Sequence, residues 1–342
     1  MPRPYDMKTF WKSARRWLHG VIISLIAIAL IPIVIKVDLQ SLAQVIYKAN
    51  YWILLFALAI SWTWLAVRGL VWRTLLRNKA SYKQVFFTLC EGYLLNNFLP
   101  LRLGELGRAY LLGRKAGLPF MEVLSSIVIE RIMDVAFTVT VLLIAVPFIV
   151  GSSAAFQIAL VVGALVVVGA LVLFLLARNR ERALGWFDTL TARWPKLQER
   201  GGRFLTPLFS GLAVVTEGWL FLRALLWMTL NWIFAVTQFY LMVLAFLPNA
   251  TIAWAMFGLG AAAFAGAVPS LPGGIGTYDA TLAAALTLVS HAASASLAVA
   301  LVAHLLNYVL TGLFGAYALS TEGETLMGIY RQLRRRQAEP QA

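Results

Sequence analysis

The chain has 342 residues, of which 61% are hydrophobic and only 13% are charged. A soluble domain of this length does not need so much apolar surface, and the continuous apolar runs lack the alternation of outer-membrane barrel strands. The formal net charge of +14 would suit nucleic acid, but the basic residues collect between the apolar runs, so we expect no nucleic-acid partner. The composition therefore predicts an all-α, polytopic integral membrane helical bundle.

Cysteine and histidine offer little chemistry in this sequence. Cys90 is the only cysteine, which excludes an internal disulfide, and the three histidines show no metal-ligand spacing. We therefore expect no metal and no cofactor.

The first part of the chain alternates basic and apolar segments. A basic segment at 1–20, predicted to be cytoplasmic, precedes an apolar run at 21–35. Because no small-residue cleavage site follows, we interpret this run as a retained first span rather than a signal peptide. A second span is predicted at about 51–67, and the basic stretch at 68–83, which contains Arg68 and no acidic residue, is predicted to be a loop.

Residues from about 82 to 129 are predicted to form a first broken hairpin. The first half carries lysine, glutamate and asparagine side chains and is too polar for a lipid-exposed span. A run at 96–108 then interrupts it with a proline and two arginines. A re-entrant hairpin that enters from the basic side fits this pattern, and a pair of short tilted spans stays open as the alternative.

Full spans follow at about 132–150 and 154–177, then an arginine-rich cytoplasmic loop at 178–207 and a long apolar segment at about 219–247. A second broken hairpin is predicted at about 251–290. Its centre holds two prolines and three glycines, which cannot continue a regular helix.

The last predicted span covers about 293–318 and is followed by a basic cytoplasmic tail at 319–342. The transmembrane domain thus extends over 21–318, with about six full spans and two broken hairpins, or about eight membrane segments in total.

The distribution of positive charge predicts the orientation. Cytoplasmic loops of membrane proteins collect Lys and Arg, and the basic segments fall on one face if each hairpin returns to the side it entered from. We therefore expect both termini in the cytoplasm of a bacterial inner membrane, with anionic inner-leaflet lipids beside them. The hairpins then dip in from opposite faces, which predicts an inverted repeat with a binding site near the midplane.

The first break and the start of the following span hold ionisable residues that suit a transport site. Arginine offers a planar fork to phosphate or carboxylate, and ionisable groups inside membrane segments commonly mark a pathway. Glu105 and Arg108 are three residues apart, as are Arg131 and Asp134, so each pair is within reach over one helical turn. The candidate residues here are Asn96, Asn97, Pro100, Arg102, Gly104, Glu105, Arg108, Glu130, Arg131 and Asp134. The alternatives are a salt-bridged interfacial loop for the arginines and a structural staple for the last three.

The second break offers backbone amide groups rather than charged side chains. Its glycines let amide groups approach a ligand closely, and a tyrosine and an aspartate open the next helix. The candidates are Pro272, Gly273, Gly274, Gly276, Tyr278 and Asp279. Helix capping is the alternative role for Asp279. His304 and Asn307 share a helical face in the last span, and we expect His304 to be a packing residue rather than a proton carrier.

Three of these motifs together resemble one family. The segments 96–108 and 272–278, and Glu130-Arg131 with Asp134, are similar to hallmarks of the lysylphosphatidylglycerol synthase transmembrane, flippase-like family, over roughly residues 15–320. The resemblance implies movement of a polar or charged lipid headgroup between leaflets. Asp279 departs from it, because the family is expected to carry glutamate there.

The resemblance does not identify the substrate. Bifunctional members add a soluble aminoacyltransferase domain, but this chain ends about twenty residues after the last predicted span, so lipid aminoacylation is not expected. Stand-alone members are linked to glycolipids, hopanoid-type lipids and polyprenyl-phosphate carriers.

The sequence therefore favours a flippase or transporter of a phospho- or glycolipid, and not an enzyme. No nucleotide-binding P-loop occurs, so transport would be downhill or ion-coupled. Two alternatives remain. One is an accessory lipid-binding subunit of a cell-envelope lipid pathway that works with a partner lipid synthase. The other is a membrane-embedded polyprenyl-phosphate-dependent transferase, which is disfavoured by the absence of an Asp-x-Asp metal motif.

Overall fold

The computed structural model describes residues 38–99, 103–194, 198, 201–202, 217–267, 272–321 and 328–329. Within these residues it contains eleven α-helices, one short 3-10 helix and no strand, which confirms the all-α prediction. The predicted first span at 21–35, the basic N-terminal segment and most of the tail lie outside the described residues.

Most neighbouring helices are separated by only a few residues in the sequence, with α8 and α11 as the exception. Their bounds are α2 (Leu39–Tyr47), α3 (Tyr51–Leu75), α4 (Tyr82–Phe98), α5 (Leu103–Ala116), α6 (Phe120–Val150), α7 (Ser153–Arg178), α8 (Arg180–Thr191), α11 (Gly218–Phe246), α12 (Ile252–Ala267), η2 (Pro272–Gly274), α13 (Thr277–Ser290) and α14 (Ala293–Thr321). Four helices in the described part, α3, α6, α11 and α14, are long and apolar enough to cross a bilayer. The protein is therefore a multi-pass membrane protein.

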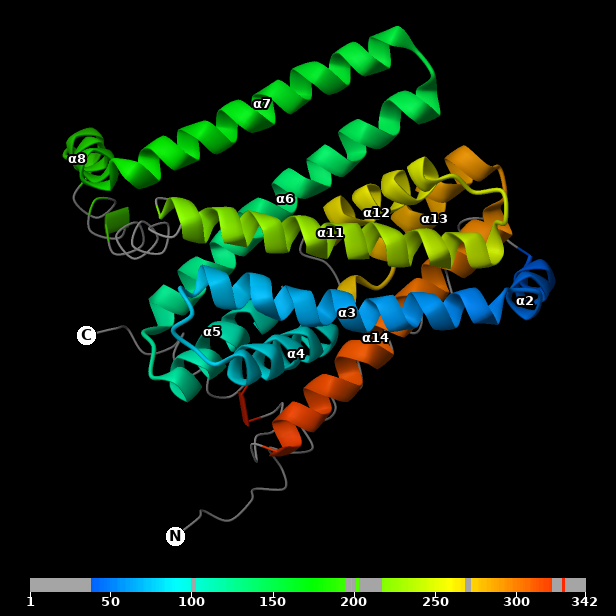
Figure 1. Ribbon diagram of the computed structural model, residues 1–342, viewed down its shortest axis with the longest axis horizontal. Helices are drawn as coiled ribbons and strands as arrows, with labels where there is room; N and C mark the ends of the chain where they lie inside the picture. The colour runs from blue at the N-terminus through cyan, green and yellow to red at the C-terminus, as the bar shows by residue number, and fades with distance from the viewer. Residues whose placement is uncertain are drawn as a thin grey trace.

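The core of the bundle is built from helices that are far apart in the chain. In Figure 1, α3 and α11 lie side by side, and α14 crosses beneath them and packs against α4. Helices α12 and α13 form a hairpin that packs on α6 and α14, while α4 and α5 form a second hairpin against α6. Helix α7 turns back along α6 and projects beyond the other helices in Figure 1.

Two predicted boundaries were wrong. Helix α3 continues to Leu75, so Arg68 lies inside a helix and is 3% exposed, where a basic loop was expected. The predicted boundary between the first broken hairpin, which was expected to end at about 129, and the span at about 132–150 is also absent, because α6 runs from Phe120 to Val150 as one helix. In both places the charged side chains that suggested a boundary are paired with opposite charges inside the bundle.

The first break joins two closely packed helices. Helix α4 ends at Phe98 and α5 begins at Leu103. Pro100 and Arg102 lie between them and are outside the described residues. A Cβ atom on Gly104 would lie 2.2 Å from the Gly92 carbonyl oxygen and 2.4 Å from Asn96 Oδ1. The Asn96 side chain instead accepts a hydrogen bond from the Gly104 N–H at 2.9 Å. Glycine at position 104 is thus needed for helix packing.

The second break turns on glycines with positive φ. Helix α12 ends at Ala267, and the chain enters η2 with φ of 67° at Gly273 and 76° at Gly274, followed by 86° at Gly276 before α13 begins. Only glycine adopts these angles readily. A Cβ on Gly273 would also lie 1.4 Å from the Tyr308 hydroxyl oxygen, so the turn lies directly on α14.

We predict that Gly104→Ala destabilises the protein, because the added methyl group would collide with the α4 backbone. Overpacking of this kind costs about 1–3 kcal/mol, so the unfolding midpoint in detergent should fall measurably. Gly169→Ala in α7 is the matched control, because nothing lies within 4 Å of its Cβ position. Equal midpoints for the two variants would contradict the packing argument.

Candidate functional site

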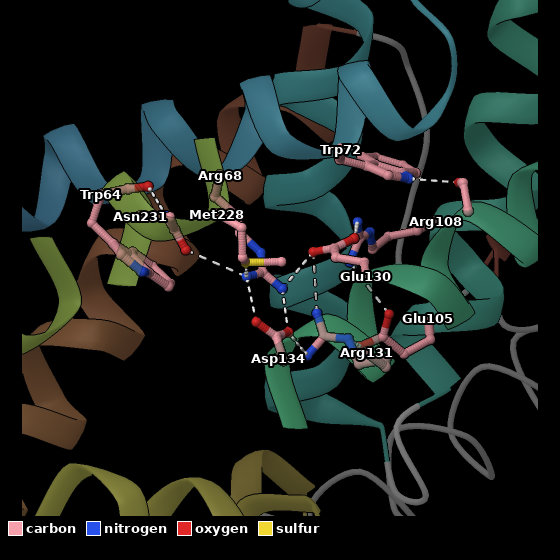
Figure 2. Close-up of polar contacts among 11 residues, drawn as sticks. Trp64, Arg68, Trp72, Glu105, Arg108, Glu130, Arg131, Asp134, Met228 and Asn231 are labelled. Atoms are coloured by element: carbon pink, nitrogen blue, oxygen red, sulfur yellow. Dashed lines mark hydrogen bonds and ion pairs between the residues drawn. The ribbon is translucent and has the colours of Figure 1, made fainter. Parts of the chain in front are cut away.

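The centre of the bundle contains a network of three arginines and three carboxylates whose formal charges cancel. Its members are Arg68 from α3, Glu105 and Arg108 from α5, and Glu130, Arg131 and Asp134 from α6 (Figure 2). Sequence positions as far apart as 68 and 134 therefore meet in one cluster.

Glu130 is the hub of this network. Its side chain is fully buried, and its Oε1 lies 2.6 Å from Arg68 Nη2. Its Oε2 lies 2.7 Å from Arg108 Nη2, and Arg131 Nη2 lies 3.4 Å from Oε1. An isolated carboxylate would be very costly at this depth, so the three guanidinium groups are what allow Glu130 to remain charged.

Arg68 links α3 to both α6 and α11. Its Nη1 donates to Asp134 Oδ1 at 2.7 Å, and its Nη2 contacts the other carboxylate oxygen. Nη1 also lies 3.4 Å from Asn231 Oδ1, and Asn231 Nδ2 donates to the carbonyl oxygen of Trp64 at 2.9 Å (Figure 2). Asn231 therefore joins the charged cluster to the paired helices α3 and α11.

Arg108 closes the buried side of the network. Its side chain has no exposed surface, and its guanidinium carbon lies 4.0 Å from the centroid of the Trp72 ring. Its Nη1 lies 3.3 Å from Glu105 Oε2. These contacts hold Arg108 inside the protein, so it stabilises the network from its buried side.

Arg131 is the most accessible member, with 32% of its side chain exposed. Its Nη1 lies 3.3 Å from Asp134 Oδ2, the i,i+3 contact that the sequence predicts, and its Nε lies 3.7 Å from Glu105 Oε1. Asp134 and Glu105 are 18% and 16% exposed, so one edge of the network is open while its centre is closed.

The open edge faces a cavity of about 600 Å³ between the two broken hairpins. Charged, amide and aromatic groups line it from α3, α4, α5, α6, α11, η2, α13 and α14. They include Arg68, Glu105, Arg131, Asp134, Asn96, Asn97, Asn231, Gln238, Asn307, Trp64, Tyr93, Trp232 and Tyr278, together with Gly273 and Gly274 of the turn. The cavity therefore brings charged and amide groups, beside an apolar part of its lining, to the core of an apolar bundle.

The second half of the site contains a buried acid and a histidine. Asp279 accepts a hydrogen bond from the Gly276 N–H at 3.0 Å, which is the capping role considered from the sequence. Its other oxygen lies 2.6 Å from Nδ1 of His304 in α14. The pair lies beside the cavity lining, because Tyr278 and Gly273, which both contact His304, reach the cavity.

The structure brings most of the predicted site residues to one region, with different placements. Eight of them line the cavity: Asn96, Asn97, Glu105, Arg131, Asp134, Gly273, Gly274 and Tyr278. Arg108, Glu130 and Asp279 are buried behind them, and Gly104 and Gly276 shape the adjoining backbone. Pro272 begins η2, and Pro100 and Arg102 lie outside the described residues.

Sequence reasoning missed five residues of this region: Arg68, Asn231, Gln238, His304 and Asn307. The run of basic residues predicts a loop around Arg68, and a single histidine in an apolar span predicts a packing role for His304. Asn231 and Gln238 were overlooked, although each is a polar residue in the apolar stretch that forms α11. That pattern of isolated amides in a long apolar helix is the signal that could have found them.

These observations define the class of protein. It is a multi-pass α-helical membrane protein with two interrupted helix pairs around a cavity whose lining includes charge-balanced side chains. Residues 17–315 match the model of a family described as the lysylphosphatidylglycerol synthase TM region, and the chain belongs to that family. Comparisons with curated proteins and with solved structures found no match. Membership indicates a membrane protein of lipid metabolism or transport, consistent with a lipid substrate.

We predict that Arg68→Met strongly destabilises the protein, because it leaves Asp134 and Glu130 short of a buried partner. Breaking a buried ion pair from one side costs about 3–5 kcal/mol. Arg77→Met is the matched control, because Arg77 pairs with Glu217 and both side chains are more than 40% exposed. The control should change stability by about 0–1 kcal/mol. Unfolding in detergent measures the stability of both variants. Similar losses of stability would contradict the claim that burial makes the ion pairs of Arg68 strong.

Proposed function

We propose that this protein moves a lipid with a polar or charged headgroup between the leaflets of the membrane. The headgroup occupies the cavity between the two broken hairpins while the acyl chains remain in the bilayer. The observation that carries this proposal is that the charged network is closed at Glu130 but opens onto the cavity at Arg131, Asp134 and Glu105.

A purely structural role for the network does not account for this opening. A charge at the centre of a membrane helix costs about 2.5–3.5 kcal/mol on insertion scales, so a staple between helices is expected to be closed on all sides. Here Arg131 keeps 32% of its side chain exposed toward a cavity of about 600 Å³. A cavity of this volume is within the range of small-molecule sites.

The charge balance indicates how a headgroup binds. The network has no net charge, so it does not attract a ligand by overall charge. It binds a headgroup by exchanging contacts within the network for contacts with the headgroup. Phosphate oxygens replace Asp134 and Glu105 at the planar fork of Arg131, because guanidinium matches phosphate in a bidentate geometry. An amine on the headgroup pairs with the carboxylate oxygens that Arg131 gives up, while Asp134 keeps its contacts with Arg68 and Glu105 keeps its contact with Arg108. Amide side chains on the opposite walls supply hydrogen bonds to uncharged hydroxyl groups.

The buried members of the network serve a different purpose in this proposal. Arg108 and Glu130 fix the orientation of Arg131 and Arg68 rather than touch the headgroup, which revises the sequence-based expectation that Arg108 contacts phosphate. Transport is downhill or ion-coupled, and the protein is not an enzyme. The bacterial inner membrane and cytoplasmic termini remain predictions from the distribution of positive charge.

The test is a leaflet-translocation assay in proteoliposomes with labelled anionic, zwitterionic, cationic and glycosylated lipids. We expect wild-type protein to move at least one headgroup class and Arg131→Gln to abolish that movement while remaining folded, because the variant lacks the exposed guanidinium fork. Arg77→Gln is the control, since it removes an arginine from an exposed ion pair that does not line the cavity.

Two results would contradict the proposal. One is wild-type protein that binds labelled lipid but moves none, which would favour the accessory lipid-binding subunit. The other is Arg131→Gln protein that moves lipid as fast as wild type, which would make the network a structural staple.

A further inference from the structure

A carboxylate–imidazole pair lies behind the cavity wall in the second half of the protein. Asp279 Oδ1 and His304 Nδ1 are 2.6 Å apart, with side chains that are 1% and 10% exposed. On the other side of the ring, His304 Nε2 lies 3.1 Å from the carbonyl oxygen of Gly273. Both ring nitrogens therefore face an oxygen.

The two contacts of the His304 ring require one proton more than a neutral histidine and a carboxylate carry together. A carbonyl oxygen only accepts hydrogen bonds, and a neutral imidazole donates through one nitrogen alone. If Nδ1 carries the proton, the Nε2 lone pair faces the Gly273 oxygen. If Nε2 carries it, the Nδ1 lone pair faces the carboxylate of Asp279. Both contacts are attractive when the pair holds an additional proton, either as imidazolium with carboxylate or as a carboxylic acid that donates to Nδ1.

Loss of that proton weakens the hold on the glycine turn. The contact with Asp279 is shorter and involves a carboxylate, so the contact with the uncharged Gly273 carbonyl is the one that is given up. Gly273 and Gly274 line the cavity, and the turn lies against Tyr308 on α14. The proton on the pair therefore controls whether the glycine turn, which forms part of the cavity wall, stays hydrogen-bonded to His304 on α14.

Among the residues that the structure describes, few other titratable groups face the pair. Tyr278 and Tyr308 contact the His304 ring, with centroids 5.1 and 4.8 Å away. Helix α12 contains no titratable residue, α2 contains only the exposed Tyr47, and α11 places Tyr240 in the apolar cluster shared with Tyr278. The groups that reach the shared cavity from the other elements are Arg68, Tyr93, Glu105, Arg131 and Asp134.

We propose that the Asp279–His304 pair is the proton-binding site that couples a transmembrane pH gradient to lipid movement, with the bound proton holding the Pro272–Gly274 turn against α14. The coupling role rests on the transport function proposed above. The proton-binding role does not, because it follows from the contacts of His304 alone. The two parts can therefore fail separately.

The first experiment measures the proton itself. Protein labelled with nitrogen-15 in its histidines is placed in lipid nanodiscs, and the ring signals are followed by NMR from about pH 5 to pH 9, the range in which histidine ordinarily titrates. His304→Gln assigns the His304 signal. We expect both ring nitrogens of His304 to be protonated, or to share a proton with Asp279, at the acid end, and one proton to be lost as the pH rises.

Asp279→Asn should change this titration, whereas His291→Asn, at an exposed helix end, should not. Asparagine tolerates the left-handed backbone at position 291, where φ is 55°. A His304 ring that keeps a single neutral tautomer over the whole range, in wild type, would overturn the proton-binding site.

The second experiment measures coupling in the translocation assay. Wild-type protein should move lipid faster under a pH gradient of one polarity than without a gradient, and His304→Gln should lose this acceleration. Lipid movement in wild type that ignores the gradient would overturn the coupling role while leaving the transport function intact. If wild type moves no lipid at all, the transport function fails and the coupling role fails with it, while the NMR titration still decides the proton site.

Discussion

The buried carboxylate of Glu130 is the constraint on which the rest of the structure depends. A fully buried charge in an apolar bundle needs partners from several directions, and here they come from three arginines on three helices. Satisfying Glu130 brings α3 and α5 together with α6 around one point, and Arg68 extends the arrangement to Asn231 on α11. The network thus fixes the relative positions of helices that begin far apart in the chain.

This arrangement also explains why charged groups reach the cavity. The same side chains that neutralise Glu130 extend beyond it, and Arg131 and Asp134 reach the open space between the two broken hairpins. Another part of the lining is provided by Gly273 and Gly274 of the turn and by α13 and α14. Asp279 of α13 and His304 of α14 lie beside this part of the lining. One half of the protein thus presents paired charges to the cavity, and the other half presents backbone and aromatic groups with the Asp279–His304 pair beside them.

Sequence patterns were sufficient where they depended on local chemistry. Two prolines and three glycines cannot continue a helix, and the structure has its turn at Pro272–Gly274. The spacing of Glu105 with Arg108 and of Arg131 with Asp134 predicted contacts that the structure contains. Membership of the family followed from motifs of the same local kind.

Local patterns failed where a residue depends on a distant partner. Arg68 follows an apolar run and precedes other basic residues, so the sequence offers no reason to place it inside a helix. Its burial depends on Asp134 and Glu130, more than sixty positions away. His304 is a single polar residue in an apolar span, and only its approach to Asp279 and Gly273 separates it from an ordinary packing residue. The cavity itself is formed by several helices and could not be predicted from any one segment.

The most direct test of the account is a structure determined by electron cryomicroscopy in nanodiscs that contain the lipid class moved in the translocation assay. We expect a headgroup inside the cavity, with polar atoms at hydrogen-bond distance from Arg131, and acyl chains leading out to the bilayer. A cavity without a headgroup under these conditions, with Arg131 bound only to Glu105 and Asp134, would contradict the central claim that the open edge of the network is a lipid-binding site.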